Sequence, residues 1–194
     1  MKLPISIMLY SALIYSVRSQ KCSSTKECEK WWPEADCVRS RCRCPPNTLK
    51  KPSLFYSYVC LSTYDAATGM DGPAFTCPLP EGSGSQMIYR NKSQITFCKT
   101  ESNDVCPIGY ECIQALSPPY DENTPDGVCC PTRETSCAMP IADHKNDGGR
   151  LRRWGFNGHR CVAFSWNPER PSTANNFKTK LHCEYSCIND LGFL

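Results

Sequence analysis

The sequence predicts a small, disulfide-rich, multidomain protein that ends in an α+β module, with irregular cysteine-rich modules before it. Two observations lead to this fold class. First, 16 of the 194 residues are cysteine, a density typical of secreted disulfide scaffolds and not of metal sites. Second, the cysteines divide along the chain into groups of six, six and four, so that each group can close its own bridges. Modules of this size bury little core, and each bridge should add ~2–4 kcal/mol of stability.

Residues 1–19 are expected to be a secretory signal peptide. Met1-Lys2 precedes an apolar run from Leu3 to about Tyr15, and Ser16 to Ser19 then offers small residues for cleavage. A membrane anchor is the alternative, but the run falls short of the ~20 apolar residues that a spanning helix needs. We therefore expect a secreted, extracellular protein without membrane insertion.

Residues 20–60, the first module, hold six cysteines with a tight Cys42-Arg43-Cys44-Pro45-Pro46 knot. Their spacing resembles that of EB or EGF-like modules, while six cysteines by themselves allow fifteen pairings. Trp31-Trp32-Pro33 is open to two interpretations, an exposed binding patch or rings that cover a disulfide in a module short of aliphatic core.

Residues 61–76 are mostly small or polar and include Gly69, Gly72 and Pro73, which predicts a linker. Residues 77–136, the second module, hold the next six cysteines. The runs Phe97-Cys98, Cys106-Pro107-Ile108-Gly109-Tyr110-Glu111-Cys112 and Gly127-Val128-Cys129-Cys130-Pro131 resemble, in that order, the lustrin-type cysteine-rich repeat of invertebrate matrix proteins. Neighbouring Cys129 and Cys130 should reach two different partners. Asn91-Lys92-Ser93 is a sequon, so Asn91 is a candidate glycosylation site.

Residues 137–194, the third module, contain a predicted hairpin followed by a helix. Residues 153–157 and 162–166 both alternate in the manner of half-buried strands, and Gly158-His159-Arg160 is short enough to join them. Cys183 and Cys187 are four residues apart, which places both thiols on one face of a helix.

Four features of the third module occur in a family-like order: the cysteine spacing, the aromatic hairpin, Asn175-Asn176-Phe177 and the closing C-x-x-x-C. Residues 136–188 thus resemble a Kunitz (pancreatic trypsin inhibitor) domain, which often accompanies lustrin-type repeats in nematodes. The resemblance implies bridges Cys137–Cys187 and Cys161–Cys183. It leaves out the third bridge of the family, which pins the protease-binding loop to its neighbour.

In a Kunitz domain that loop is rigid and extended, so that it binds a serine protease at little cost in ordering entropy. Counting forward from Cys137 places the missing cysteine at Asn146 and the specificity residue at Asp147, whereas counting back from Trp154 gives Gly148. The partner position of the missing bridge falls near Glu169. None of the candidates is a cation, and without the bridge we expect residues 145–150 to sample many shapes.

The remaining patterns exclude several functions. The third module is rich in arginine and lysine, but secretion and the absence of a reader motif argue against a nucleic-acid partner. Its histidines lack metal-ligand spacing, and neither G-x-S-x-G nor H-E-x-x-H occurs, so we expect no enzyme, metal or cofactor. Two functions compete. One is a Kunitz-type serine-protease inhibitor or modulator with weak trypsin inhibition, and the other is a non-inhibitory extracellular-matrix protein of cuticle or moulting that binds matrix proteins.

Overall fold

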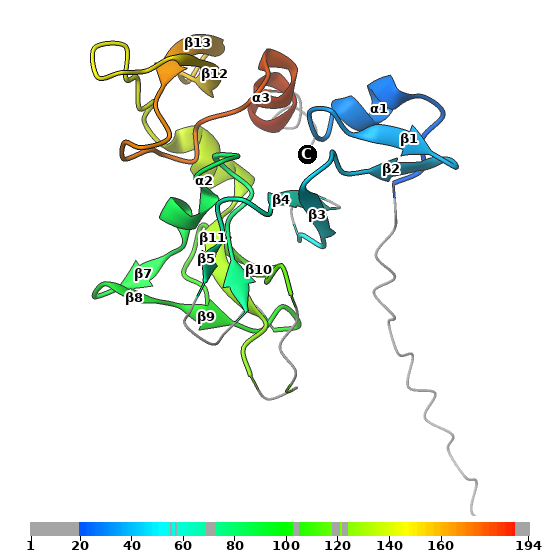
Figure 1. Ribbon diagram of the computed structural model, residues 1–194, viewed down its shortest axis with the longest axis vertical. Coiled ribbons are helices and arrows are strands. Elements are labelled where there is room, and N and C mark those ends of the chain that lie inside the picture. Colours follow the sequence, from blue (N-terminus) through cyan, green and yellow to red (C-terminus); the bar gives the residue numbers. More distant parts are fainter. Residues whose placement is uncertain are drawn as a thin grey trace, which may run out of the picture.

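The computed structural model describes residues 20–54, 56, 58–68, 73–102, 105–117, 121 and 124–188. Short two-stranded hairpins and three small helices follow one another along the chain, with eight disulfides between them. In Figure 1 the first module lies beside helix α3, and the second lies below the third. The signal-peptide prediction for residues 1–19 lies outside the described residues. Within the described ranges, no helix has the length and apolar character needed to cross a membrane.

The first module is built on two hairpins. Its elements are α1 (Thr25–Glu29), β1 (Asp36–Val38), β2 (Arg41–Arg43), β3 (Thr48–Lys51) and β4 (Val59–Ser62). Arg39 and Ser40 join β1 to β2 with φ angles of 52° and 60°, the backbone that a two-residue hairpin turn requires. The bridges Cys22–Cys37, Cys28–Cys42 and Cys44–Cys60 all close within this module.

The second module surrounds a three-stranded sheet in the order β10-β11-β9. The hairpin of β5 (Ala67–Thr68) and β6 (Ala74–Phe75) lies in the stretch 61–76 before this module. The module's own elements are a 3-10 helix (Gly84–Met87), β7 (Arg90–Asn91), β8 (Gln94–Ile95), β9 (Phe97–Cys98), β10 (Tyr110–Gln114) and β11 (Gly127–Pro131). Cys129 and Cys130 bond to Cys106 and Cys77, respectively. They reach different partners because successive side chains of a strand point to opposite faces. The third bridge is Cys98–Cys112.

The stretch predicted as a linker contributes to the core. Leu61 is fully buried, and Phe75 and Thr76 are 6% and 1% exposed. One hydrophobic cluster runs from Cys22 of the first module to Cys130 of the second and includes Leu61 and Phe75. The two modules therefore share a core, although their disulfides are separate, and a domain boundary in this stretch stays a prediction.

The third module has the hairpin and helix that its sequence predicts. Its elements are α2 (Arg133–Ala138), β12 (Leu151–Phe156), β13 (Cys161–Trp166) and α3 (Lys180–Cys187). Asn157 holds the hairpin turn, because its side-chain oxygen accepts from the backbone N–H of His159 at 3.1 Å and of Arg160 at 3.0 Å. Helix α3 begins after Thr179, whose hydroxyl accepts from His182 N–H at 3.1 Å and so satisfies a free donor of the first turn.

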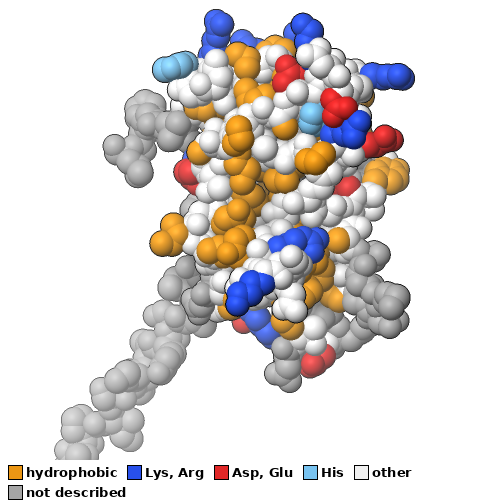
Figure 2. All heavy atoms as spheres, turned by 90° about the vertical axis from the view of Figure 1, so that its left-hand side faces the viewer, with side chains coloured by type: hydrophobic (Ala, Val, Ile, Leu, Met, Phe, Trp, Pro, Cys, Tyr) orange, Lys and Arg blue, Asp and Glu red, His pale blue; other side chains and the backbone are white. Residues whose placement is uncertain are grey.

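Two tryptophans of the first module pack against helix α3. Trp32 is 1% exposed and lies 4.9 Å from the His182 ring, while Trp31 meets Tyr185 edge-on at 4.8 Å. Trp32 also belongs to the buried cluster with Cys22, Cys28 and Cys42, which agrees with the interpretation that the rings cover disulfides, and its contact with α3 is an addition to it. Figure 2 shows hydrophobic side chains in an interrupted band along one face of the molecule.

Candidate functional site

The candidate site consists of two loops at the open end of the β12–β13 hairpin. The first loop covers residues 143–150 and the second covers residues 167–172. Leu151 pairs with Trp166 at the last rung of the hairpin, and Arg150 N–H donates to the Trp166 carbonyl at 3.2 Å. The two loops therefore leave the strands side by side, which brings Asn146, Asp147 and Gly148 of the first loop near the second.

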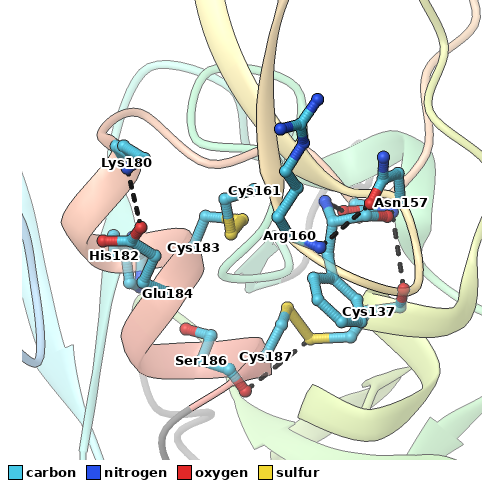
Figure 3. Close-up of a disulfide and its surroundings, with 12 residues drawn as sticks. Cys137, Asn157, Arg160, Cys161, Lys180, His182, Cys183, Glu184, Ser186 and Cys187 are labelled. Atoms are coloured by element: carbon cyan, nitrogen blue, oxygen red, sulfur yellow. Dashed lines mark hydrogen bonds and ion pairs between the residues drawn. A yellow bond between two sulfur atoms is a disulfide. The ribbon is translucent and has the colours of Figure 1, made fainter.

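The hairpin that carries these loops is held by both bridges that the Kunitz resemblance implies. Cys137 is bonded to Cys187 and Cys161 to Cys183. In Figure 3, Cys183 and Cys187 point from one face of α3 toward the hairpin and toward Cys137. The bridge Cys161–Cys183 ties α3 to the turn end of the hairpin, opposite the end that carries the two loops, and Cys137–Cys187 ties α3 to α2.

The buried side chain of Asn175 holds the same hairpin through hydrogen bonds. Its side chain is fully buried, donates to the Met139 and Phe156 carbonyls at 2.7 and 2.8 Å, and accepts from Phe156 N–H at 2.7 Å. Phe177 pairs with Trp154 through two backbone hydrogen bonds of 2.9 and 2.7 Å. The Asn175-Asn176-Phe177 motif therefore closes the edge of β12.

His144 joins the two loops from the inside. Its backbone N–H donates to the Ser165 carbonyl at 2.7 Å, and its ring lies between Asn167 N–H at 3.0 Å and the Pro171 carbonyl at 3.1 Å. Nδ1 has to be unprotonated to accept from Asn167, so Nε2 carries the proton and donates to Pro171. The ring is thus neutral in this arrangement and connects the first loop to the second.

Asp147 makes the second connection between the loops. Its carboxylate forms an ion pair with Arg170 at 2.7 Å, and its carbonyl accepts from the Asn167 side chain at 3.3 Å. Both partners of the ion pair are about half exposed, so it stabilises the fold by no more than ~1 kcal/mol. Among the described residues, no hydrogen bond or ion pair of Asn146 reaches the second loop, so the contacts between the loop tips involve Asp147.

The tip of the first loop is a closed turn. His144 carbonyl accepts from Asp147 N–H at 2.9 Å and from Gly149 N–H at 2.8 Å, and Gly148 has a φ of +73°. The Asp143 side chain accepts from Lys145 N–H at 3.0 Å and from Ser165 N–H at 3.1 Å. Local hydrogen bonds therefore hold the loop in a closed turn in this structure, and the expectation that residues 145–150 sample many shapes stays a prediction.

The second loop is covered on one side by the second module. The Pro168 carbonyl accepts from the Ser83 hydroxyl at 3.2 Å and from the Gln86 side chain at 3.4 Å, and Ser172 N–H donates to Gln86 at 3.1 Å. Next to them, Arg153 donates to the Glu81 carbonyl at 2.9 Å, with its guanidinium 4.4 Å from the Trp166 ring centre. The segment from Glu81 to Gln86 is thus a wall of the candidate site, and we call it the clamp segment.

No local pattern in the sequence identifies His144 or the clamp segment as parts of the site. His144 has no metal-ligand spacing, and the clamp segment precedes the second loop by more than 80 residues. Two cysteine clusters, Cys22-Cys28-Cys42 and Cys98-Cys106-Cys112, have their sulfurs close enough to hold a metal ion, but the chain has no free cysteine. Their sulfurs are tied up in disulfides and offer no thiolate ligands.

Comparison with known proteins identifies the family. No family model matches the chain, and no solved structure does. The chain is 50% identical over 193 residues to the Kunitz-type protein bli-5 of Haemonchus contortus, an alignment that covers 95% of this chain and 96% of that protein. It is 49% identical over 187 residues to the Kunitz-type protein bli-5 of Caenorhabditis elegans, covering 96% and 90% of the two chains. With identity at this level over nearly the whole length, and with the hairpin, helix and two bridges in place, the chain belongs to the Kunitz-type proteins.

Proposed function

We propose that this protein is a secreted, extracellular Kunitz-type modulator of serine proteases that does not block trypsin by the substrate-like route. The observation that carries the proposal is the closed turn at residues 144–149. A protease binds a substrate-like loop in extended form, whereas this turn uses backbone N–H groups of Asp147 and Gly149 in its own hydrogen bonds. Opening it would cost these bonds before any protease contact formed, at a net ~0.5–1.5 kcal/mol each.

The side chains at the tip support the same proposal. A trypsin-like specificity pocket contains a buried carboxylate and selects a cation. Asp147 would be repelled there and is paired with Arg170, and Gly148 has no side chain to offer. The clamp segment adds a steric argument, since a protease seated over the second loop has to contact the second module as well.

A panel of serine proteases tests the proposal, with inhibition and binding measured separately on the purified protein. We expect no nanomolar inhibition of trypsin. Nanomolar inhibition by the unmodified protein would overturn the proposal, because it would show that the loop is already a competent inhibitor.

Two engineered variants test the role of the loop directly. Asn146→Cys with Glu169→Cys and Asp147→Lys rebuilds the bridge in the forward register, and Asp147→Cys with Glu169→Cys and Gly148→Lys rebuilds it in the backward register. We expect at least one of them to gain trypsin inhibition. The matched control in each register has the two cysteines without the lysine, and it should gain none.

A matrix role is the second candidate, and the exposure of large apolar side chains favours it. Leu54, Tyr64, Val105 and Ile108 are 63%, 79%, 59% and 105% exposed, all within the first two modules or the stretch between them. Disulfide-stapled modules with such side chains suit contacts with extracellular-matrix proteins, as in a cuticle or during moulting. Retention on matrix proteins without any protease binding would favour this candidate over the first.

We also infer that residues 20–60 and 77–136 are an EB/EGF-like and a lustrin-type module, since all six of their bridges close inside those ranges. Asn91 is the proposed glycosylation site. It is exposed at the β7–β8 hairpin, where Lys92 and Ser93 have φ angles of 47° and 70°. Glycosidase should lower the mass of the secreted protein, and Asn91→Gln should remove that shift.

A further inference from the structure

All three modules meet at a small cavity beside helix α3. The cavity has a volume of ≈ 10 Å³, about the room that the centre of a single water molecule needs. Its walls include Trp32 and Tyr56 from the first module, Leu79, Pro131 and Ser136 from the second, and His182 from the third. The cavity therefore lies where side chains from distant parts of the chain converge.

Three of the wall residues carry buried polar atoms that lack a hydrogen-bond partner within the described part of the chain. They are Trp32 Nε1, the Tyr56 hydroxyl, and both ring nitrogens of His182. Trp32 and His182 are 1% and 2% exposed, so bulk solvent does not reach them. Their rings lie at 58° to each other with centres 4.9 Å apart, which is a packing contact and not a hydrogen bond.

Leaving these groups unpaired would be costly. A buried donor or acceptor without a partner costs ~1–3 kcal/mol, and native proteins rarely tolerate several at one place. Burial raises the pKa of the Tyr56 phenol and the neighbouring Ser186 side chain opposes this only in part, while the hydroxyl has no hydrogen-bond partner among the described residues. Protein groups alone therefore do not satisfy this cluster.

We propose that the cavity binds one water molecule that accepts a hydrogen bond from Trp32 Nε1 and bonds to the His182 ring and the Tyr56 hydroxyl. One water can serve Trp32 Nε1, the Tyr56 hydroxyl and one ring nitrogen of His182, while the other ring nitrogen of His182 is outside this set. The indole N–H only donates, a neutral imidazole has one donor and one acceptor, and a hydroxyl does both, while water offers two donors and two acceptors. Burial lowers the pKa of His182 to about 3, so the ring is neutral near pH 7 and keeps an acceptor nitrogen. Buried waters typically make about three such bonds.

The bound water joins the first module to the third without a covalent bond. Its two ring partners, Trp32 and His182, are 150 positions apart in the chain and belong to different disulfide groups. The water-binding site is thus a hydrogen-bonded contact between the modules, and it fixes the orientation of the third module and its two loops.

Solution NMR of the whole protein tests the proposal. In the unmodified protein, the Trp32 indole proton should show a nuclear Overhauser effect to a long-lived water and should exchange slowly with solvent. Water relaxation dispersion should then count one long-lived water fewer in Trp32→Phe and in His182→Phe. Trp31→Phe is the matched control and should keep the count, since Trp31 packs edge-on against Tyr185 outside the cavity.

Two results would overturn the proposal. One is the absence of a water contact to the Trp32 indole proton in the unmodified protein, which needs no variant to fold. The other is an unchanged count of long-lived waters in a folded Trp32→Phe protein.

Discussion

At the scale of single residues, His144 connects the two loops of the candidate site through hydrogen bonds. The ring is 9% exposed and bonds to backbone groups of the second loop on both of its nitrogens. A disulfide limits the distance between two loops, whereas a neutral imidazole also fixes the direction of a donor and an acceptor. The first loop can therefore keep one conformation although the family's third bridge is missing.

Replacing His144 by alanine should loosen both loops. Asn167 N–H and the Pro171 carbonyl would lose their partner, and the free energy of unfolding should fall by ~1–3 kcal/mol. Chemical denaturation measures the loss, and amide exchange at Asn167 should become faster. His159→Ala is the control, because His159 is exposed in the hairpin turn and should change stability by less than ~0.5 kcal/mol. Equal losses in both variants would contradict the role given to His144.

At the scale of elements, the β12–β13 hairpin is both the support of the loops and the docking face for the clamp segment. Gly82 lies beside it, and a side-chain carbon at Gly82 would make an ordinary contact of 3.6 Å with the Trp166 ring. Arg153 covers that ring and donates to Glu81, so one strand residue orders a segment of another module.

Replacing Arg153 by alanine should therefore detach the clamp segment. We expect the free energy of unfolding to fall by ~1.5–3 kcal/mol, the range for hydrogen bonds from charged groups. Amide exchange near Ser83 and Gln86 should become faster. Arg152→Ala is the matched control, because Arg152 is exposed and lies only over the Trp154 ring at 5.1 Å. Unchanged exchange at Ser83 and Gln86 in Arg153→Ala would show that the clamp segment docks without Arg153.

At the scale of the whole molecule, the buried His182 makes stability depend on pH. Burial lowers the pKa of His182 to about 3 in the folded protein, whereas an unfolded chain titrates near ~6.5. Below pH ~6.5 the His182 ring binds a proton in the unfolded state but not in the folded state. The contribution of neutral His182 to the free energy of unfolding is therefore fully present above pH ~6.5 and is lost as the pH falls toward 3.

We expect the free energy of unfolding to fall by up to ~1.4 kcal/mol per pH unit below ~6.5 on account of this group. Denaturant titrations at several pH values between 5 and 7 measure this slope. Ordinary carboxylates titrate below that pH range, so they contribute little to it. His182→Phe should flatten it, while His159→Ala should not. A slope that persists in His182→Phe would place the sensitive group elsewhere.

Much of the fold could be predicted because it depends on local patterns. Cysteine grouping separates the disulfides into three sets, and the alternation of residues 153–157 and 162–166 predicts strands that the structure places at 151–156 and 161–166. Cys183 and Cys187 lie on the expected helix, because a spacing of four residues has a direct meaning in a helix. For the candidate site, the sequence predicts the loop and shows that neither candidate specificity residue, Asp147 or Gly148, is a cation.

The sequence by itself determined the grouping of the cysteines, the hairpin and the helix of the third module, and the chemistry of Asn146, Asp147 and Gly148, while the pairing of the cysteines in the first two modules came from the structure. Only the tertiary structure decided the shape of the loop and the environment of Trp32. The contacts responsible join His144 to Pro171, Ser83 to Pro168 and Trp32 to His182. Each of these contacts depends on how separate elements pack against one another. A periodic pattern in the sequence indicates which face of its own element a residue occupies, but it does not indicate which distant residue that face contacts.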